Sequence, residues 1–294
     1  MRLRPNIKVT MDGKSKARGN EAMAQRPKIG LALGSGGARG FAHIGVLQTL
    51  LHHGIPIDVI AGSSMGALLG AVYATGAPLT MMERLACHMP TTSWIDFTVP
   101  HRGFVAGERI HQLIKMLTKD YTFAQTTLPL AIVATDVERG ERVVFTEGKL
   151  HDAVRASISI PGIFVPYEYQ GRLLVDGGVI DRVPIMAARE LGSDIVIAVD
   201  VGYFEKLPPV KNIIDIIIQA TDIMQREMFT HSILHADFVV RPELDLMSAT
   251  SFAGTGVEKA IEAGRSKMET LMPSLLEFLQ KKGVSIGGSD AFTP

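Results

Sequence analysis

The residues best suited to chemistry lie between Gly62 and Gly66, where Ser64 is the centre of a Gly-x-Ser-x-Gly pattern. A β-branched run, residues 57–60, precedes the pattern, and a helix-forming segment, residues 67–74, follows it. A turn of this kind between a strand and a helix is typical of a nucleophile elbow, which holds a serine hydroxyl outward on a sharp, strained bend. The pattern therefore predicts a serine nucleophile for acyl transfer, at a helix N-terminus that favours developing negative charge.

A glycine-rich loop, residues 34–40, follows the first predicted strand, residues 28–33. It departs from a dinucleotide-binding fingerprint because Arg39 stands where the third glycine is required. It also departs from a Walker A loop, which ends in Gly-Lys-Ser/Thr where this chain has Gly40 and Phe41. What the loop offers is a run of consecutive backbone amides beside one arginine, an arrangement that favours an anion or an oxyanion.

This loop is expected to lie beside the serine. The succession of strand, loop, helix and strand over residues 28–60 is a βαβ unit, which predicts a parallel sheet. The carboxyl ends of adjacent parallel strands lie at the same edge of a sheet. We therefore expect the amides of Gly36, Gly37 and Ala38 to converge near Ser64 and to form an oxyanion hole.

Asp176 is the candidate proton acceptor for the serine. It follows a predicted strand, residues 172–175, and precedes Gly177 and Gly178, which allow a carboxylate to approach another backbone closely. The alternative interpretation of this sequence is an ordinary Asp-Gly turn. The residues alone leave both interpretations open.

Histidine is the usual base for a serine nucleophile. The chain order of Ser64, Asp176 and then His231 or His235 would suit the triad of an α/β-hydrolase. However, both histidines fall in a predicted helix, residues 211–235, and not in the strand-end loop that a catalytic histidine requires. They also lack the glutamate of a His-Glu-x-x-His motif, and no metal site is predicted there or elsewhere in the chain.

The composition is that of a globular protein, with 46% of the 294 residues hydrophobic, 20% charged and a formal net charge of zero. Zero net charge argues against general nucleic-acid binding. The single cysteine, Cys87, excludes an intrachain disulfide and suits a reducing compartment. An uncharged stretch, residues 59–82, approaches the ~20 residues of a membrane span, but its glycines, proline and hydroxyls indicate a buried strand, turn and helix.

The remaining elements alternate in the manner of one α/β domain. Further strands are predicted at residues 128–137, 141–145, 172–175, 194–201 and 237–241, and helices at 42–53, 149–159, 184–191, 211–235 and 257–282. The first two of these strands form a hairpin, and the apolar strand 194–201 is expected at the sheet centre. The segment 89–104 is interpreted either as a lid or wall of the site or as a plain connecting loop.

Residues 34–40, 62–66 and 176–178, in this order and spacing, resemble the motifs of the patatin-like phospholipases. Residues 156–162 are similar to a further sequence block of that family, and the resemblance covers residues 27–245. It implies a three-layer α/β/α sandwich with a mainly parallel central sheet. It also implies a Ser-Asp dyad without histidine that acts on lipid acyl esters.

Each functional position of the family has a counterpart in this chain. Ser64 matches the nucleophile and Asp176 the proton acceptor. The matched oxyanion-loop positions are Gly36, Gly37, Ala38 and Arg39, and the remaining motif glycines are Gly34, Gly40, Gly62, Gly66, Gly177 and Gly178. Ser35 stands where many relatives have glycine, a change of little consequence because backbone amides bind the oxyanion.

A dyad demands more of its aspartate than a triad does. An unperturbed aspartate has a pKa of ~3.9 and is a much weaker base than imidazole, with a pKa of ~6.5. We therefore expect either that burial raises the pKa of Asp176 or that the oxyanion loop contributes more of the catalysis.

The sequence thus predicts a serine acyl-ester hydrolase of the phospholipase A, lysophospholipase or esterase type, with no cofactor and no metal. Its expected partners are a phospholipid or another acyl ester and, transiently, a membrane surface, and its expected location is the cytoplasm, peripheral to the membrane. Residues 1–26 are expected to form a disordered basic tail, 27–245 the hydrolase domain, and 246–294 a C-terminal helix and tail packed on it. A non-catalytic lipid-binding or regulatory module and a Ser-His-Asp hydrolase are the alternatives.

Overall fold

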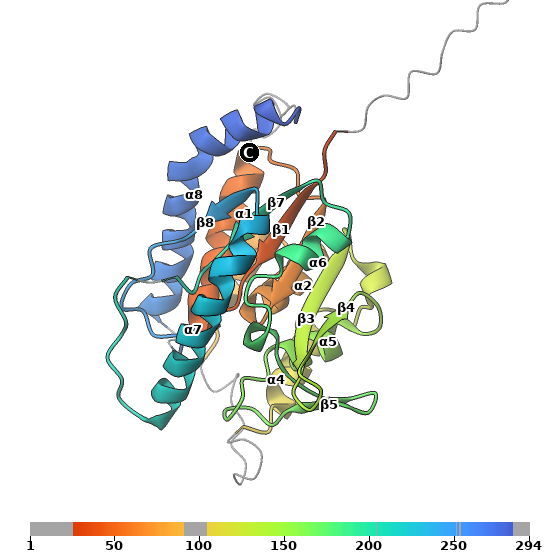
Figure 1. The fold of residues 1–294 in the computed structure, drawn as a ribbon, viewed down its shortest axis with the longest axis vertical. Coiled ribbons are helices and arrows are strands. Elements are labelled where there is room, and N and C mark those ends of the chain that lie inside the picture. Colours follow the sequence, from red (N-terminus) through yellow and green to blue (C-terminus); the bar gives the residue numbers. More distant parts are fainter. Residues whose placement is uncertain (1–25, 91–104, 204, 251, 253, 285–294) are drawn as a thin grey trace, which may run out of the picture.

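The computed structural model describes residues 26–90, 105–203, 205–250, 252 and 254–284. The predicted N-terminal tail, apart from Arg26, lies outside the described residues. So do most of the segment 89–104 and the chain beyond Val284. A mixed sheet forms the centre of the described part (Figure 1).

Eight strands make up this sheet. They are β1 (Ile29–Leu33), β2 (Val59–Ser63), β3 (Leu130–Asp136), β4 (Glu141–Phe145), β5 (Tyr167–Tyr169), β6 (Arg172–Asp176), β7 (Ile195–Val199) and β8 (Phe238–Val240). Their order is β5-β6-β3-β2-β1-β7-β8, with β4 paired to β3. The pairs among β3, β2, β1, β7 and β8 are parallel, whereas β4, β5 and β6 join by antiparallel pairs.

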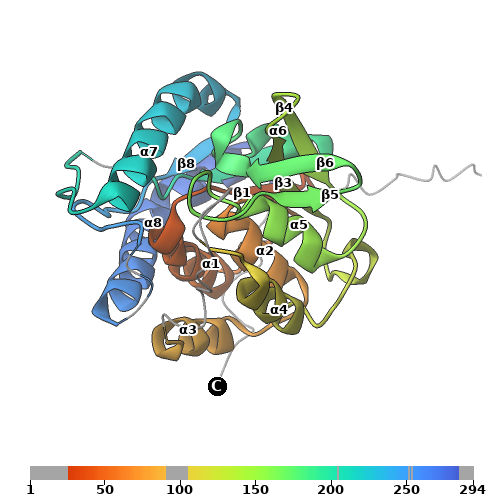
Figure 2. The same cartoon turned by 90° about the horizontal axis from the view of Figure 1, so that it is seen from below.

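Helices cover both faces of the sheet (Figures 1 and 2). One apolar core lies between the sheet and α1 (Ala42–His52), α2 (Met65–Ala74), α3 (Leu79–His88), α4 (Glu108–Leu117), α5 (Leu150–Ser157) and α8 (Thr255–Lys281). A smaller core lies between the opposite face and α6 (Ile185–Glu190) together with the C-terminal part of α7 (Ile213–Ser232). Leu31 and Leu33 of β1 point into the first core and Ala32 into the second, as the alternation of a strand requires. The predicted α/β/α sandwich with a mainly parallel sheet is confirmed.

Three strands differ from the sequence-based prediction. β2 continues past its predicted end to Ser63, because Gly62 still pairs with both β1 and β3 and Ser63 still pairs with β3. β7 is fully buried but lies second from the sheet edge, between β1 and β8, and not at the centre. β5 was not predicted, because three residues at a sheet edge are too few to show an alternating pattern.

The uncharged stretch, residues 59–82, is divided among β2, α2 and the start of α3. Nine of the ten residues of α2 are buried, which explains why it contains no charge. In the part of the chain that the structure describes, no helix combines the length and the apolar character needed to cross a membrane.

Candidate active site

Ser64 lies on a sharp bend between the end of β2 and the start of α2. Its backbone φ of 52° and ψ of −120° lie in a region that residues with a side chain rarely adopt, so the bend is strained. Hydrogen bonds hold it in place. The Ser64 N–H donates to Ser157 Oγ at 2.9 Å, and that hydroxyl donates to the carbonyl of Val133 at 2.6 Å.

The glycines on either side of Ser64 allow α2 to lie unusually close to the sheet. A Cβ at Gly66 would lie 2.2 Å from the carbonyl oxygen of Leu33, and one at Gly62 would lie 2.6 Å from that of Gly66. Any side chain at either position would therefore force α2 away from the sheet and displace the bend.

Both carboxylate oxygens of Asp176 are hydrogen-bonded. Ser64 Oγ donates to Asp176 Oδ2 at 2.6 Å, and the Gly178 N–H donates to Oδ1 at 2.7 Å. Ser64 and Asp176 are 4% and 3% exposed, so the hydroxyl and carboxylate meet almost out of contact with water. This arrangement allows the carboxylate to accept the serine proton directly.

The register of β3 brings these two residues together across 112 positions of sequence. Val133 pairs with Ser63 at the end of β2, and the next residue of β3, Ala134, pairs with Asp176 at the end of β6. Gly177 permits the close approach, because a Cβ there would lie 2.2 Å from the Val133 carbonyl. The chain reversal after Asp176 therefore depends on the glycine that follows it.

Burial raises the pKa of Asp176 to about 7. The hydrogen bonds from Ser64 and Gly178 act in the opposite direction, because they favour the charged carboxylate, and the negative charge of Asp222 adds to the rise. At neutral pH the carboxyl is therefore about as basic as a histidine. Of the two expectations for a dyad, the geometry supports the one in which burial makes the aspartate a better base.

The glycine-rich loop leaves two backbone amides without a protein acceptor. Within the described residues, no group accepts a hydrogen bond from the N–H of Gly36 or of Gly37. Gly37 lines the same cavity as Ser64. These two amides are therefore available to an oxyanion.

The next two residues of the loop use their amides within the protein. The Ala38 N–H donates to the carbonyl of Ala249 at 2.8 Å, and the Arg39 N–H donates to the carbonyl of Gly36 at 3.2 Å. The buried side chain of Arg39 forms an ion pair with Asp222 of α7 and donates to the Gly36 carbonyl at 3.3 Å. Ala38 and Arg39 therefore anchor the loop to neighbouring segments in this structure.

Two further residues at the site were not singled out from the sequence. The N–H of Met65, at the start of α2, has no acceptor among the described residues, and the amide after a nucleophile is a common oxyanion donor. His43 is fully buried below the loop, with its Nε2 at 2.8 Å from the Gly34 carbonyl. Burial lowers the pKa of His43 to about 4, so its ring is neutral and supports the loop as a hydrogen-bond donor. Met65 could have been found from the sequence, because it directly follows Ser64. No sequence pattern pointed to His43.

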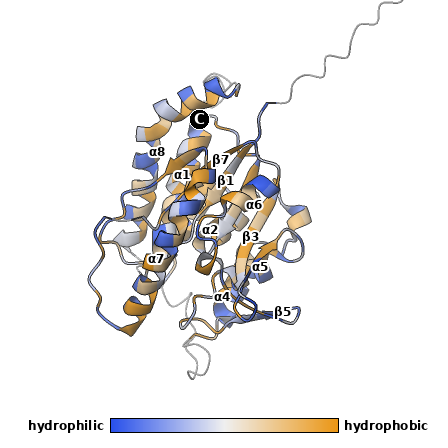
Figure 3. Cartoon of the chain, in the orientation of Figure 1, coloured by the Kyte–Doolittle hydropathy of each residue, from blue (hydrophilic) through white to orange (hydrophobic). Residues whose placement is uncertain are grey.

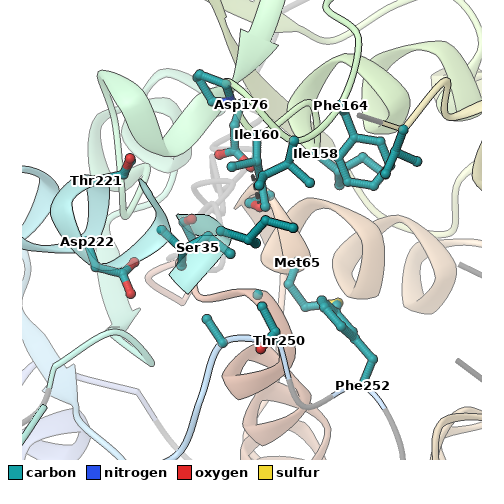
Figure 4. Close-up of a pocket in the computed structure, with 18 of the residues that line it drawn as sticks. Ser35, Met65, Ile158, Ile160, Phe164, Asp176, Thr221, Asp222, Thr250 and Phe252 are labelled. Carbon is teal, nitrogen blue, oxygen red and sulfur yellow. Dashed lines mark hydrogen bonds between the residues drawn. The ribbon is translucent and has the colours of Figure 1, made fainter. Parts of the chain in front are cut away.

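A cavity of about 310 Å³ opens beside Ser64 and Asp176 (Figure 4). Its walls are mainly apolar and include Met65, Leu68, Val105, Ile110, Ile158, Ile160, Phe164, Ile214, Ile218 and Phe252. Thr221 and Asp222 of α7 lie on one side of it and Phe164 on the other (Figure 4). A hydroxyl–carboxylate pair in an apolar cavity suits a molecule with one reactive polar group and a large apolar part.

The histidines of the alternative triad lie elsewhere. His231 lies in the last turn of α7, and His235 is in the short 3-10 helix that follows; both are exposed, and neither lines the cavity beside Ser64. The hydrogen bonds that Asp176 accepts in the described structure come from Ser64 and Gly178. The fold therefore does not bring either histidine to the serine.

The sequence model of the patatin-like phospholipases matches residues 31–189, more than half of this chain. This chain belongs to the patatin-like phospholipase family. The matched part runs from β1 to α6 and so contains the glycine-rich loop, Ser64 and Asp176.

Relatives with this patatin-like region are found in bacteria, animals and fungi. An uncharacterized NTE family protein of Mycobacterium tuberculosis is 39% identical over 184 residues, which are 62% of this chain and 51% of that protein. Patatin-like phospholipase domain-containing protein 7 of Mus musculus is 36% identical over 184 residues, 59% of this chain and 14% of its own. Lysophospholipase NTE1 of Pyricularia oryzae is 34% identical over 183 residues, 59% of this chain and 12% of its own. This patatin-like chain thus spans about half of the mycobacterial relative and a smaller share of the other two.

The fold also matches a solved structure. VipD from Legionella pneumophila superposes with a TM-score of 0.61 and 14% sequence identity, over 85% of this chain and 67% of VipD. At that identity the likeness concerns the fold alone.

Proposed function

We propose that this protein is a serine hydrolase of lipid acyl esters, with Ser64 as nucleophile and Asp176 as proton acceptor. The observation that carries the proposal is the 2.6 Å hydrogen bond from Ser64 Oγ to a buried carboxylate beside an apolar cavity. The name of the fungal relative, a lysophospholipase, supports lipid acyl esters as the substrate class.

The reaction begins when Ser64 Oγ attacks the ester carbonyl and its proton passes to Asp176 Oδ2. The oxyanion that forms is stabilised by the free amides of Gly36 and Gly37 and by the amide of Met65 at the start of α2. Asp176 then gives the proton to the leaving alcohol as the tetrahedral intermediate collapses to an acyl-enzyme. In the second half of the reaction Asp176 takes a proton from the water that attacks the acyl-enzyme. It returns this proton to Ser64 Oγ as the Ser64–acyl bond breaks and the fatty acid leaves.

The remaining motif residues position these groups. Ala38 and Arg39 hold the oxyanion loop through Ala249 and Asp222, so they act through its geometry. The apolar cavity provides room for the acyl chain, because burying methylene groups there removes ~0.8 kcal/mol of unfavourable hydration for each one.

We also propose that α7 brings the cavity to a membrane surface. Ile213, Ile216 and Met224 of α7 are each more than half exposed. Figure 3 shows hydrophobic residues along α7 among hydrophilic ones. Ile214 and Ile218 of the same helix line the cavity, so the exposed apolar face is continuous with the cavity wall. Apolar side chains on a surface helix favour insertion into the headgroup region of a bilayer.

The proposed activity is tested with purified protein and a panel of lipid acyl esters, comparing wild type with Ser64→Ala and Ser63→Ala. Ser63 is the matched control, because its buried hydroxyl has no hydrogen-bond partner and its loss leaves the dyad intact. We expect Ser64→Ala to lower kcat by ~10⁴-fold or more, and Ser63→Ala to retain activity. A fluorophosphonate is expected to label Ser64 in wild type and in Ser63→Ala.

Lipid binding without turnover, together with an unreactive Ser64, would instead indicate a non-catalytic lipid-binding module. Turnover that survives Ser64→Ala would contradict the proposed nucleophile.

A further inference from the structure

Three metal-ligating side chains converge at the junction of α4, α5 and β5, away from the Ser64–Asp176 pair. His111 comes from α4, and His151 and Asp152 come from the first turn of α5. His111 Nε2 lies 2.8 Å from His151 Nδ1 and 3.2 Å from Asp152 Oδ1, and the last two atoms are also 3.2 Å apart. Figure 2 shows α4 beside α5, with β5 near both.

The spacing of these atoms suits a small divalent cation. Zinc bound at ~2.0–2.1 Å to tetrahedral nitrogen and oxygen ligands places those ligands ~3.3 Å from one another. The three atoms here form a triangle with sides of 2.8, 3.2 and 3.2 Å, so shifts of a few tenths of an ångström create three bonds. The side chains of His111 and Asp152 are 17% and 22% exposed, which leaves room for water as a fourth ligand.

The surroundings also orient His151 as a ligand. Its second nitrogen, Nε2, lies 3.2 Å from Asp120 Oδ1, a contact at ion-pair distance that does not have hydrogen-bond geometry in this structure. The negative charge of that carboxylate favours the ring proton on Nε2, which leaves the lone pair of Nδ1 for the metal ion. A histidine whose outer nitrogen donates to a carboxylate is a common support of metal ligands. Lys149 Nζ holds Asp120 Oδ1 at 3.0 Å, and Tyr167 donates to Asp152 Oδ1 at 2.5 Å.

We propose that His111, His151 and Asp152 bind one divalent transition-metal ion, with zinc the preferred ion among them. Two imidazole nitrogens and one carboxylate oxygen favour zinc and its neighbours over Mg²⁺ and Ca²⁺, which prefer oxygen ligands alone. The ion takes no part in the Ser64 chemistry. It ties α4 to α5, and because Ile110 of α4 lines the apolar cavity, it stiffens one wall of that cavity.

The test is a metal titration of chelator-treated, full-length protein. Isothermal titration with Zn²⁺ is expected to give saturable binding of one ion per chain, and the Tm is expected to rise by several degrees at a 100-fold excess over Kd. Co²⁺ is expected to give the visible absorption bands of a tetrahedral ion. Mg²⁺ and Ca²⁺ are expected to change neither readout.

Variants locate the site. His111→Gln is expected to weaken Zn²⁺ binding by ~100-fold or more. Asp120→Asn is expected to weaken it by ~10-fold to 100-fold, because Asp120 contacts His151 Nε2 and none of the three proposed ligand atoms. His231→Ala is the matched control, because it removes a histidine outside the proposed site. With His235, four residues along the chain, it forms a pair of histidines that are close in sequence and exposed to a metal ion. Circular dichroism of each metal-free variant establishes that it is folded.

Two results would overturn the proposal. One is the absence of stoichiometric binding of Zn²⁺ or Co²⁺ by folded wild-type protein, which would leave the three side chains as a hydrogen-bonded cluster only. The other is Zn²⁺ binding to His111→Gln with the affinity of wild type, whatever the result for His231→Ala. The test is independent of hydrolysis, so its outcome does not depend on the proposed activity.

Discussion

Two helices that line the same cavity, α2 and α7, differ sharply in how they are held. Nine of the ten residues of α2 are buried, and Ser64 at its start is fixed by hydrogen bonds that it donates to Ser157 and Asp176 of neighbouring elements. Of the twenty residues of α7, only Gln225 and Phe229 are buried, and several of its isoleucines and methionines face outward. One cavity therefore has a rigid wall that carries the reactive groups and a wall with little support from the core.

The difference separates two requirements of a lipid hydrolase. Proton transfer between Ser64 and Asp176 needs atoms held at hydrogen-bond distance, which close packing provides. Contact with a lipid surface needs exposed apolar side chains, which a helix in a tightly packed core does not offer. Elements with few buried contacts are also those that open most readily. Under the proposed function, the α2 side therefore holds the groups that react and the α7 side meets the lipid surface.

Asp176→Asn is expected to give the largest change on the α2 side after loss of the nucleophile itself. The amide cannot accept the serine proton, so kcat falls by ~10³-fold. Asp181→Asn is the matched control, because Asp181 pairs with Arg142 at 3.2 Å and does not contact Ser64. Equal activity of wild type and Asp176→Asn would contradict the dyad.

The same variant is expected to be more stable than wild type at alkaline pH. Because the pKa of Asp176 is raised to about 7, the folded protein binds more protons than the unfolded chain between pH ~4 and 7, and stability is lost as the pH rises through this window. Asparagine carries no charge to bury, so the Tm of Asp176→Asn exceeds that of wild type at pH 8 and approaches it near pH 4.

The activity of wild type is expected to rise with pH, with an ascending limb near pH 7. Only the carboxylate of Asp176 accepts a proton, and it forms as the pH rises through its raised pKa of about 7. Between pH 5 and 8, kcat/KM for a neutral ester is therefore expected to increase by ~100-fold. A flat profile over this range would show that kcat/KM does not depend on ionisation of Asp176, and would contradict its role as the proton acceptor.

Gly66→Ala tests the packing of α2. Its methyl group would lie 2.2 Å from the Leu33 carbonyl oxygen, and overpacking of this kind costs ~1–3 kcal/mol, or ~2–12 °C of Tm. Ala220→Ser on α7 is the comparison, because Ala220 is exposed and the change should move the Tm by less than ~2 °C. Thermal unfolding of both variants measures the contrast. Equal losses would mean that the two helices are held alike.

The double variant Ile213→Ser/Ile216→Ser tests the α7 side. It removes two exposed apolar side chains, so we expect weaker sedimentation with phospholipid vesicles and ~10-fold slower hydrolysis of vesicle lipids. Hydrolysis of a soluble short-chain ester should be unchanged, because neither side chain lines the cavity. An equal loss on both substrates would argue against a role in membrane contact.

His231→Ala and His235→Ala are expected to have the smallest effect. Both histidines are exposed and neither lines the cavity, so kcat/KM should stay within about twofold of wild type. A loss of several hundred-fold in either variant would favour a histidine-based triad and would require another arrangement of α7.

Features that depend on neighbouring residues could be predicted from the sequence. Gly62, Gly66 and the apolar run after them indicated a strand, a turn and a helix, and α2 (65–74) contains the whole helix-forming segment predicted at 67–74. The alternation of strands and helices, which is also set by residues close together in the sequence, indicated the layered α/β fold. The family motifs then indicated which serine and aspartate to pair.

Features that depend on residues far apart could not be predicted in this way. The apolar residues of α4 recur at helical spacing, but nothing in that spacing indicates that Ile110 lines a cavity together with Phe164. The triangle of His111, His151 and Asp152 likewise joins positions 40 residues apart. The hydrogen bond from the Ala38 N–H to the Ala249 carbonyl likewise joins the glycine-rich loop to a residue more than two hundred positions away. None of these contacts leaves a local signal.

The sequence by itself determined the bend that exposes Ser64, because a strained turn needs particular residues at adjacent positions. Only the tertiary structure decided which group lies within hydrogen-bond distance of that serine. The register of β3 places Asp176 one strand position beyond Ser63, and burial there raises the pKa of the carboxyl to about 7. Proximity and desolvation are properties of the packed sheet, and no spacing in the sequence specifies them.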